Sequence, residues 1–454
     1  MNTFVKTVKN WVGKYIQDRS GVTAAAFGIA LPALVAAGGL AVDLGQAYNI
    51  QNRLGNAVDK AALAVAGSTG DEAELEDRME AFMDANYPEH KIGSAYDVTL
   101  DLTGNVVTIS ANASVSTKFM TIFGKDYVDV SAFTEVTREL SGLEVALVLD
   151  VTGSMAGSNI AALKTASLDF MEIMFDRIDD PEYLKIGLVP YSSSINVGPY
   201  GLGLDLSGGN YGTPFVTPPD TDDFYSDPTD LVYNPSVYRQ WHGCVLTQDY
   251  PGDTEDVSSS PWEMYRYPRY CRRYRYGSCT SWYENPNYNC PDTPVVPLTN
   301  NRTQLDSTIN ALSAQGYTYG NLGMVWGGRL VSPEEPFTEG ADWDDVRWRK
   351  AILMMTDGNN TMHYRYSAYG LTDDHNITPT DLNERFEETC ENIKAQGVQI
   401  YTVTFQSGIN ENTKGFYRRC ASDESKYFHA PSNSELVSVF QEIANQLSKL
   451  HISK

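Results

Sequence analysis

The sequence contains few histidines and no closely spaced pair of cysteines. Its 454 residues include six histidines and six cysteines, and a Cys-x-x-Cys motif is absent. Because structural zinc sites are usually built from such pairs, the composition disfavours a zinc-binding class. An even number of cysteines is instead typical of disulfides in a protein exported to an oxidising compartment.

Basic residues are scarce outside the N-terminus. The chain carries 34 Lys and Arg residues against 58 Asp and Glu residues, a formal net charge of −24. Residues 1–20 hold four basic residues and one acidic residue, so the remainder carries a net charge of −27. A body this acidic repels nucleic acid at a distance, and we expect no nucleic-acid partner.

Long uncharged runs are also rare, and residues 21–42 form the one that stands out. Since about 20 apolar residues cross a bilayer core, this run predicts a single transmembrane helix. The basic residues before it predict a cytoplasmic N-terminus and a periplasmic body, with the helix in a bacterial inner membrane. Residues 1–20 are then a cytoplasmic or interfacial segment. A cleaved signal peptide is the alternative.

Residues 43–140 are predicted to form a membrane-proximal helix followed by a β-rich stalk. The helical pattern of the membrane segment continues to about residue 66. Alternating apolar and polar residues over 97–110 predict a hairpin about Gly104, and residues 127–137 predict a further strand. Because no cluster of titratable residues occurs in this region, we expect it to serve in spacing and packing, as a small pilin-like α+β unit.

Two later apolar runs each end in an aspartate. Residues 145–149 lead into Asp150, and a second run leads into Asp357. Continuous apolar strands are typical of parallel sheets that are covered on both faces, and such sheets bind ligands at the carboxyl ends of their strands. We therefore expect a doubly wound, Rossmann-like α/β domain. Asp150, with the hydroxyls of Thr152 and Ser154 just after it, would lie at the sheet edge.

A glycine-flanked turn between the two runs offers a third hydroxyl, that of Thr318. In type, order and strand context, these residues resemble the von Willebrand factor A family and its metal-ion-dependent adhesion site. The family pattern carries over to five positions: Asp150, Thr152, Ser154, Thr318 and Asp357. The resemblance implies a divalent cation held by oxygen atoms, with Mg²⁺ first and Mn²⁺ or Ca²⁺ as the alternatives. A carboxylate of a partner protein would complete its coordination.

Other interpretations of Asp150 compete with a metal site. An Asp-x-Thr-Gly-Ser turn by itself is often a helix cap. A phosphatase similar to the haloacid dehalogenases would need a second acid two residues after Asp150, where Thr152 stands. A metal-dependent hydrolase using Asp150 and Asp357 would need a general base, and the sequence offers no plausible one. We therefore expect binding and no enzymatic activity.

The predicted von Willebrand A domain is interrupted by a long insertion. The domain covers residues 141–197 and 298–454, and the insertion, residues 198–297, is rich in tyrosine, proline and cysteine. Arginine and tyrosine alternate over residues 265–276, a pattern that could stack on single-stranded bases but that we assign to a protein or glycan contact. The cysteines leave many pairings open. Our prediction is Cys244–Cys290 around Cys271–Cys279, with Cys390–Cys420 separate.

Residues 20–66 carry a second resemblance. Its features are Arg19-Ser-Gly21, the step Leu31-Pro32, Gly39-Leu-Ala-Val-Asp43, and Asp59-Lys-Ala-Ala-Leu-Ala after Gln51-Asn-Arg-Leu. In these features the segment resembles the Tad-type (Flp) pilus assembly proteins of the TadE/TadG group. With a von Willebrand A body, the chain resembles the TadG-like members in particular.

These two resemblances imply a membrane-anchored, metal-dependent, protein-binding scaffold in pilus assembly or anchoring, with pilus-assembly or pilin-like proteins as partners. A surface adhesin that binds host, matrix or glycan ligands is the alternative. Relatives cleaved by prepilin peptidase carry glutamate five residues after the glycine at the cleavage site. If Gly21 were that glycine, Ala26 would stand at this position. We therefore expect the helix to remain in the membrane.

Overall fold

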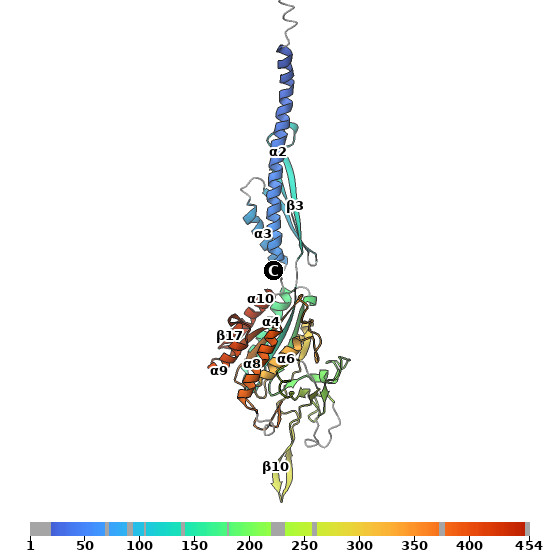
Figure 1. Cartoon of the computed structure of the whole chain (residues 1–454), viewed down its shortest axis with the longest axis vertical. Helices are drawn as coiled ribbons and strands as arrows, with labels where there is room; N and C mark the ends of the chain where they lie inside the picture. The colour runs from blue at the N-terminus through green and yellow to red at the C-terminus, as the bar shows by residue number, and fades with distance from the viewer. Residues whose placement is uncertain are drawn as a thin grey trace, which may run out of the picture. The chain divides into compact units, whose positions relative to one another are not determined.

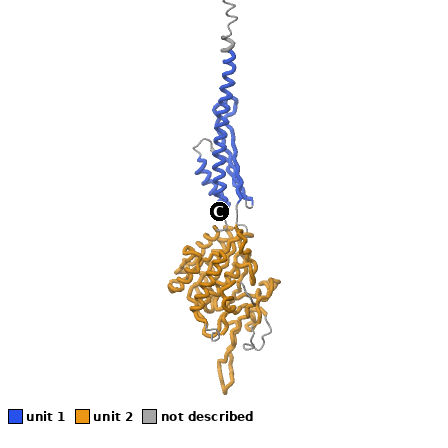
Figure 2. Tube along the Cα trace, viewed as in Figure 1, with its two compact units in different colours: residues 1–139 blue, residues 140–454 orange. Residues whose placement is uncertain are grey.

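The computed structural model divides the chain into two compact units, residues 1–139 and residues 140–454 (Figure 2). The described parts of the chain are 20–68, 72–88, 94–103, 106–137, 141–178, 181–218, 232–256, 261–371 and 377–449. Residues 1–19, which make up almost all of the predicted basic segment, lie outside them.

A long helix and a three-stranded antiparallel sheet form the first unit (Figure 1). The elements are α2 Ser20–Ala66, α3 Glu72–Asn86, β1 Ser94–Thr103, β2 Val106–Ser116, η1 Met120–Phe123 and β3 Tyr127–Thr137. Strand β2 pairs with both neighbours. Thr103 pairs with Val106, and the predicted turn residues between them lie outside the described residues.

The core of this unit follows from two periodicities. Every second residue of β2 is buried, as expected for a strand with one face against a helix. In α2 the buried residues Leu54, Val58 and Ala61 recur at helical spacing, and Leu75 and Met79 do so in α3. These side chains form one apolar cluster. The C-terminal half of α2 is therefore a core helix of a small α+β unit.

The N-terminal part of α2 is different. From Ala25 to Gly38 each described residue is exposed or half-exposed, and Gly39 is the first that is buried. Large apolar side chains point outward there, among them Phe27, Ile29 and Leu34. Within the described residues, α2 is the one helix that is long and apolar enough to cross a membrane.

The second unit contains an eight-stranded sheet in the order β17-β16-β13-β4-β5-β6-β8, with β12 also paired to β5. Its strands are β4 Gly142–Asp150, β5 Leu184–Tyr191, β6 Ile195–Asn196, β8 Cys244–Val245, β12 Val296–Thr299, β13 Trp348–Thr356, β16 Gln399–Phe405 and β17 Tyr427–Ala430. The pairs β4–β5, β4–β13, β13–β16 and β16–β17 are parallel. The pairs that involve β6, β8 and β12 are antiparallel.

Helices cover both faces of this sheet. One apolar cluster joins it to α4 Ser158–Arg177, α5 Arg302–Ala311 and α10 Asn433–Ser448. The other cluster joins it to α6 Gly320–Val331, α8 Pro379–Ala395 and α9 Glu411–Cys420. Strand β4 is buried along its whole length, and its residues alternate between the clusters, with Leu147 in one and Val148 in the other. The predicted doubly wound α/β fold is confirmed.

The insertion is ordered in the parts that the structure describes. Its strands include β7 Val216–Thr217, β9 Trp262–Glu263, β10 Tyr270–Arg275 and β11 Ser278–Tyr283, and two short strands after β13 are β14 Tyr366–Ser367 and β15 Gly370–Leu371. Strand β8 of the insertion extends the main sheet. The structure contains the three disulfides expected from the sequence: Cys244–Cys290, Cys271–Cys279 and Cys390–Cys420.

Candidate metal centre

The two aspartates lie at the carboxyl ends of adjacent parallel strands. Leu149 is paired with Met355 in the register of β4 and β13. Asp150 is the last residue of β4, and Asp357 follows β13 directly. The backbone N–H of Asp357 donates to Asp150 Oδ2 over 3.3 Å. Both carboxylates therefore reach the same edge of the sheet, as the sequence predicted.

Asp150 is fully buried and is held by hydrogen bonds on both oxygens. Its Oδ1 accepts from the backbone of Thr152 over 2.9 Å. Its Oδ2 accepts from the hydroxyls of Thr356, over 2.9 Å, and Tyr191, over 3.2 Å. Burial raises the pKa of Asp150, whereas the hydrogen bonds from Thr152 and Thr356 act in the opposite direction. The network thus fixes the carboxylate in place and partly offsets the rise in pKa that burial causes.

Two hydroxyls connect Asp150 to Asp357 across the rim of the site. The tight turn η2 Gly153–Met155 follows Thr152, and the buried side chain of Met155 anchors this turn. The Oγ atoms of Thr152 and Ser154 are 3.0 Å apart. Ser154 is exposed, and its hydroxyl donates to Asp357 Oδ1 over 2.6 Å. The result is a compact group of oxygen atoms that opens to the surface at Ser154.

The electrostatics of Asp357 are unfavourable without a cation. Gln406 donates its side-chain N–H to Asp357 Oδ2 over 3.3 Å. Burial, followed by the negative charge of Asp150, raises the pKa of Asp357 to about 7. Two carboxylates in one buried site disfavour the doubly ionised state. A divalent cation at this place would offset the repulsion.

The loop that carries Thr318 lies against both aspartate turns. Gln315 donates its backbone N–H to Val151 over 2.8 Å, and Gly316 accepts from Gly153 over 3.0 Å. The backbone of Thr318 makes two hydrogen bonds with Thr361, a few residues after Asp357: its carbonyl accepts from the Thr361 backbone N–H, and its N–H donates to the Thr361 hydroxyl. The structure thus joins the other four predicted residues in one hydrogen-bond network, whereas these hydrogen bonds of Thr318 run from its backbone to Thr361.

Glycine is required at position 316. Its φ is +84°, and a Cβ there would lie 2.8 Å from the Ser192 hydroxyl and 2.9 Å from that of Ser193. The loop can approach the sheet edge this closely because it has no side chain at this position.

Three residues that hold the carboxylates are missing from our prediction: Tyr191, Thr356 and Gln406. Tyr191 ends β5 and Thr356 ends β13, so both lie at the carboxyl ends of the two parallel strands that flank β4. The same rule that locates Asp150 could have found these two residues. Gln406, which follows β16, also obeys the rule.

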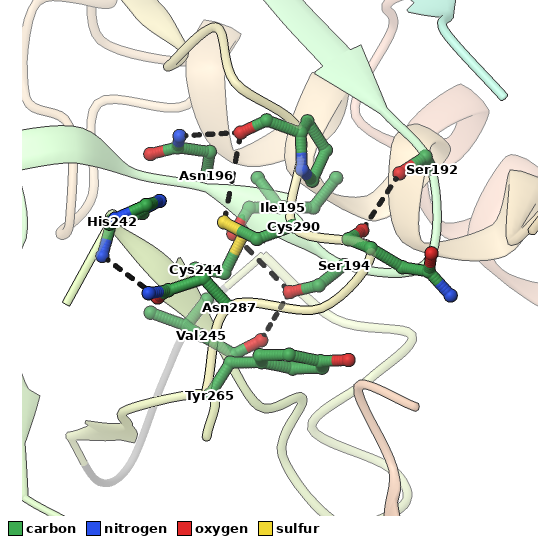
Figure 3. Close-up of a disulfide and its surroundings, with 12 residues drawn as sticks. Ser192, Ser194, Ile195, Asn196, His242, Cys244, Val245, Tyr265, Asn287 and Cys290 are labelled. Atoms are coloured by element: carbon green, nitrogen blue, oxygen red, sulfur yellow. Dashed lines mark hydrogen bonds between the residues drawn. A yellow bond between two sulfur atoms is a disulfide. The ribbon is translucent and has the colours of Figure 1, made fainter. Parts of the chain in front are cut away.

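The disulfide Cys244–Cys290 closes the insertion on itself (Figure 3), and hydrogen bonds attach this part of the insertion to the domain. Ser194 donates its hydroxyl to the carbonyl of Val245 over 2.7 Å. Asn196 donates its side-chain N–H to the carbonyl of Pro291 over 2.7 Å. The side chain of Gln315 donates to the carbonyl of Cys290. One end of the insertion is therefore fastened to the loop that leads to Thr318.

His242, near the same disulfide, has structural contacts. Its backbone N–H donates to the side chain of Asn287 over 3.1 Å (Figure 3). Its ring Nε2 lies 3.2 Å from the carbonyl of Val237. These contacts give His242 a structural role.

The oxygen atoms of the site fit a hard cation. Across the described ranges, no group of three or more His, Cys, Asp or Glu residues is placed to hold a metal ion. The site at the sheet edge has only two carboxylates, Asp150 and Asp357, and its other oxygens belong to hydroxyls. It is therefore not a group of that kind. Carboxylate and hydroxyl oxygens suit Mg²⁺, Mn²⁺ or Ca²⁺ better than softer metals.

Comparison with known proteins gives a family for the N-terminal part of the chain. Residues 21–68 match the family described as Flp pilus-assembly TadE/G-like. This is the segment in which the sequence resembles that group. No curated protein matches the chain.

Several solved structures of pilus proteins are similar to the chain. The von Willebrand factor domain of the type V pili tip protein Mfa5 from Porphyromonas gingivalis is 12% identical, with a TM-score of 0.39, and the match covers 69% of this chain and 97% of that one. The pilus adhesin SpaC from Lactobacillus rhamnosus GG is 10% identical, with a TM-score of 0.35, and the match covers 77% of this chain and 34% of that one. The chain thus spans about a third of the length of SpaC.

A third similar structure is proximal thread matrix protein 1 from the mussel byssus, with a zinc-occupied MIDAS motif. It is 14% identical, with a TM-score of 0.32, and the match covers 69% of this chain and 47% of that one.

Proposed function

We propose that the chain is a membrane-anchored, metal-dependent scaffold that binds proteins during assembly or anchoring of a Tad/Flp pilus. The observation that carries the proposal is the convergence of Asp150, Thr152, Ser154 and Asp357 at one sheet edge. The TadE/G-like match at residues 21–68 of the same chain supports the pilus assignment.

The binding site on this proposal is the group of oxygens at the rim. Ser154 and Asp357 would hold the cation directly, because Ser154 is exposed and its hydroxyl contacts Asp357. Asp150 would act from behind, directly or through water, since both of its oxygens already accept hydrogen bonds. The hydroxyls of Thr152 and Thr318 would complete the set of five ligands. A bound Mg²⁺ would supply a positive, open coordination position for a carboxylate of a pilus-assembly or pilin-like protein.

Helix α2 supports the membrane anchor. We place its apolar N-terminal part in the bacterial inner membrane, with the N-terminus in the cytoplasm and the body in the periplasm. The disulfides agree with an oxidising compartment.

The surroundings of the two carboxylates favour binding over catalysis. The described side chains that donate to them belong to Tyr191, Thr356, Ser154 and Gln406. Burial raises the pKa of Tyr191 well above its ordinary value, and the other three are not bases. Hydrolysis would require a base that is free to take a proton from water. Asp357, whose pKa is raised to about 7, already accepts hydrogen bonds from Ser154 and Gln406 on its two oxygens.

Photo-crosslinking in the native envelope tests the proposed function. Asn159 is the probe position, because its side chain donates to the backbone carbonyl of Ser154 and therefore borders the rim. With Mg²⁺ present, we expect a crosslink to a pilus-assembly or pilin-like protein, and a chelator should remove it. Asp357→Asn should remove it too, because that variant lacks one charge at the cation.

A matched probe at Arg349 serves as the control, since this exposed residue lies at the opposite end of β13. Its crosslinks should be indifferent to the chelator. An Asn159 crosslink that persists in chelator and in Asp357→Asn would contradict a metal-dependent contact.

The hairpin β10–β11 favours the alternative, a surface adhesin. It protrudes from the second unit (Figures 1 and 2), and the disulfide Cys271–Cys279 joins its strands. Tyr274 and Tyr276 are exposed, and Arg269 stacks on Trp282. Aromatic and arginine side chains in such positions are typical of interfaces. If the adhesin alternative holds, an impermeant reagent will label a cysteine placed at Tyr276 on intact cells.

A further inference from the structure

The loop between β2 and β3, residues 117–126, presents an apolar tip between two lysines. Its ends are closed by the hydrogen bond from the Thr117 backbone N–H to Asp126, over 2.9 Å. The short helix η1 and the left-handed Gly124, with a φ of +77°, turn the chain at the tip. Ile122 is 77% exposed and Phe123 is 61% exposed. A compact, ordered turn thus carries two large apolar side chains into the surroundings.

This β2–β3 loop is fastened to one level of α2. The carboxylate of Asp43, which is buried, accepts from the backbone N–H groups of Lys118, Phe119 and Met120 over 3.0, 2.8 and 2.7 Å. The ring of Phe119 packs on Gly39, where an added Cβ would lie 2.5 Å from it. The three N–H groups at the start of η1 and the missing side chain at Gly39 therefore fix the height of the loop along the helix.

That level is the end of the apolar run. Residues 21–42 are uncharged, and Asp43 is the first charged residue after them. A bilayer core needs about 20 helical residues, at about 1.5 Å of rise each. Most of the run, from Ala25 to Gly38, has no buried residue, and burial begins at Gly39. The β2–β3 loop therefore begins to pack on α2 in the last helical turn of the apolar run, where the helix would leave the membrane.

We propose that the β2–β3 loop docks on the bilayer, with Ile122 and Phe123 inserted among the lipid chains at the surface where α2 leaves the membrane. This inference rests on the membrane anchor of the proposed function. The exposed apolar side chains continue the apolar surface of α2, whose Leu34, Val35 and Val42 are exposed. Burying the tip in lipid removes apolar area from water.

The charges near the tip favour lipid over a protein partner. Lys118 and Lys125 flank it and are exposed. Lysines beside an inserted apolar group commonly reach lipid phosphates while their stems lie along the apolar zone. The rest of the chain is strongly acidic, so a basic pair at this level stands out. With two attachments to the membrane, the helix and the loop, the first unit could neither rotate nor tilt freely at the surface.

Depth-sensitive fluorescence on the full chain tests this docking. The variant Ile122→Cys is labelled with the environment-sensitive dye NBD and reconstituted in vesicles of phosphatidylcholine and phosphatidylglycerol. The label is selective, because all six native cysteines are in disulfides. We expect a blue-shifted emission, and nitroxide-labelled lipid should remove about half of it or more, as for a side chain at the acyl boundary.

Two matched positions separate the possible outcomes. Ile29→Cys, on the free part of α2, should be quenched, and Phe133→Cys should not. Phe133 lies farther from the apolar run, since its neighbour Ser131 accepts from the side chain of Gln51. Quenching at Ile29 but not at Ile122 would overturn the loop proposal and leave the anchor intact. No quenching at Ile29 would overturn the anchor itself. A blue shift at Ile122 without lipid quenching would indicate a protein partner or a second copy and would contradict the docking.

Discussion

Replacing Asp150 with alanine is expected to weaken divalent-cation binding by about two orders of magnitude, the upper range for groups that position metal ligands. The residue is fully buried, and its carboxylate organises the turn of Thr152 and the end of β13. Removing this carboxylate therefore takes away a negative charge beside the cation. It also frees the turn of Thr152 and the end of β13, whose oxygens face the cation. Isothermal titration of the second unit, residues 140–454, with Mg²⁺ measures the loss.

Two further variants make this result interpretable. Asp344→Ala removes an exposed carboxylate of the same unit and should leave Mg²⁺ binding unchanged. Asp357→Asn keeps the shape of the side chain while removing one of the two repelling charges, so it should lose the cation without loss of fold. If both Asp150→Ala and Asp357→Asn bind Mg²⁺ as the unmodified protein does, the site lies elsewhere or is absent.

The largest effect on stability is expected from Glu144→Ala. Glu144 is fully buried in β4 and accepts from Lys350 over 2.6 Å and from Lys185 over 3.1 Å. The backbone N–H of Ala341 also donates to it. The substitution would leave the ammonium of Lys350, which is almost fully buried, without its paired carboxylate. Breaking such a buried pair costs about 3–5 kcal/mol of the free energy of unfolding.

Urea denaturation of residues 140–454 measures this loss. Glu411→Ala is the matched control, because the carboxylate of Glu411 is exposed and pairs with Lys414 over 3.0 Å on the surface. An exposed pair contributes about 1 kcal/mol at most. Equal losses in the two variants would show that the buried pair does not hold the strands together as the structure indicates.

Both expected results concern the same two strands. Glu144 and Lys350 are register partners near the start of β4 and β13, and Asp150 and Asp357 lie at the other end. One ion pair thus sets the alignment of the strands that present the two aspartates. A charged residue at the matching place in two otherwise apolar strands is a sequence signal, and it could have predicted this pair.

The sequence predicted the parts of the site that depend on local pattern. Asp150, Thr152 and Ser154 follow one apolar strand, and Asp357 follows another, so strand direction alone brings them to one edge. Strand direction also brings Tyr191 and Gln406 to this edge, but it does not predict their contacts, because those depend on which strands are neighbours in the sheet. The position of the Thr318 side chain remains a prediction for the same reason.

In the first unit too, local sequence pattern predicts the elements but not the contacts between them. The helix and the hairpin follow from the periodicity of apolar residues. The role of Asp43 does not, because a single aspartate after an apolar run has the same pattern whether it is solvated or buried. Its three hydrogen bonds to residues 118–120 join segments far apart in the sequence. Only the fold brings those segments together.

The most direct test of the metal centre is a crystal structure of residues 140–454 grown with Mn²⁺ and measured for anomalous scattering. Mn²⁺ prefers the same oxygen ligands as Mg²⁺ and can be located by its own signal. We predict one strong anomalous peak, bonded to the oxygens of Ser154 and Asp357 and beside those of Asp150 and Thr318. A structure at saturating Mn²⁺ with no peak at this sheet edge would contradict the account.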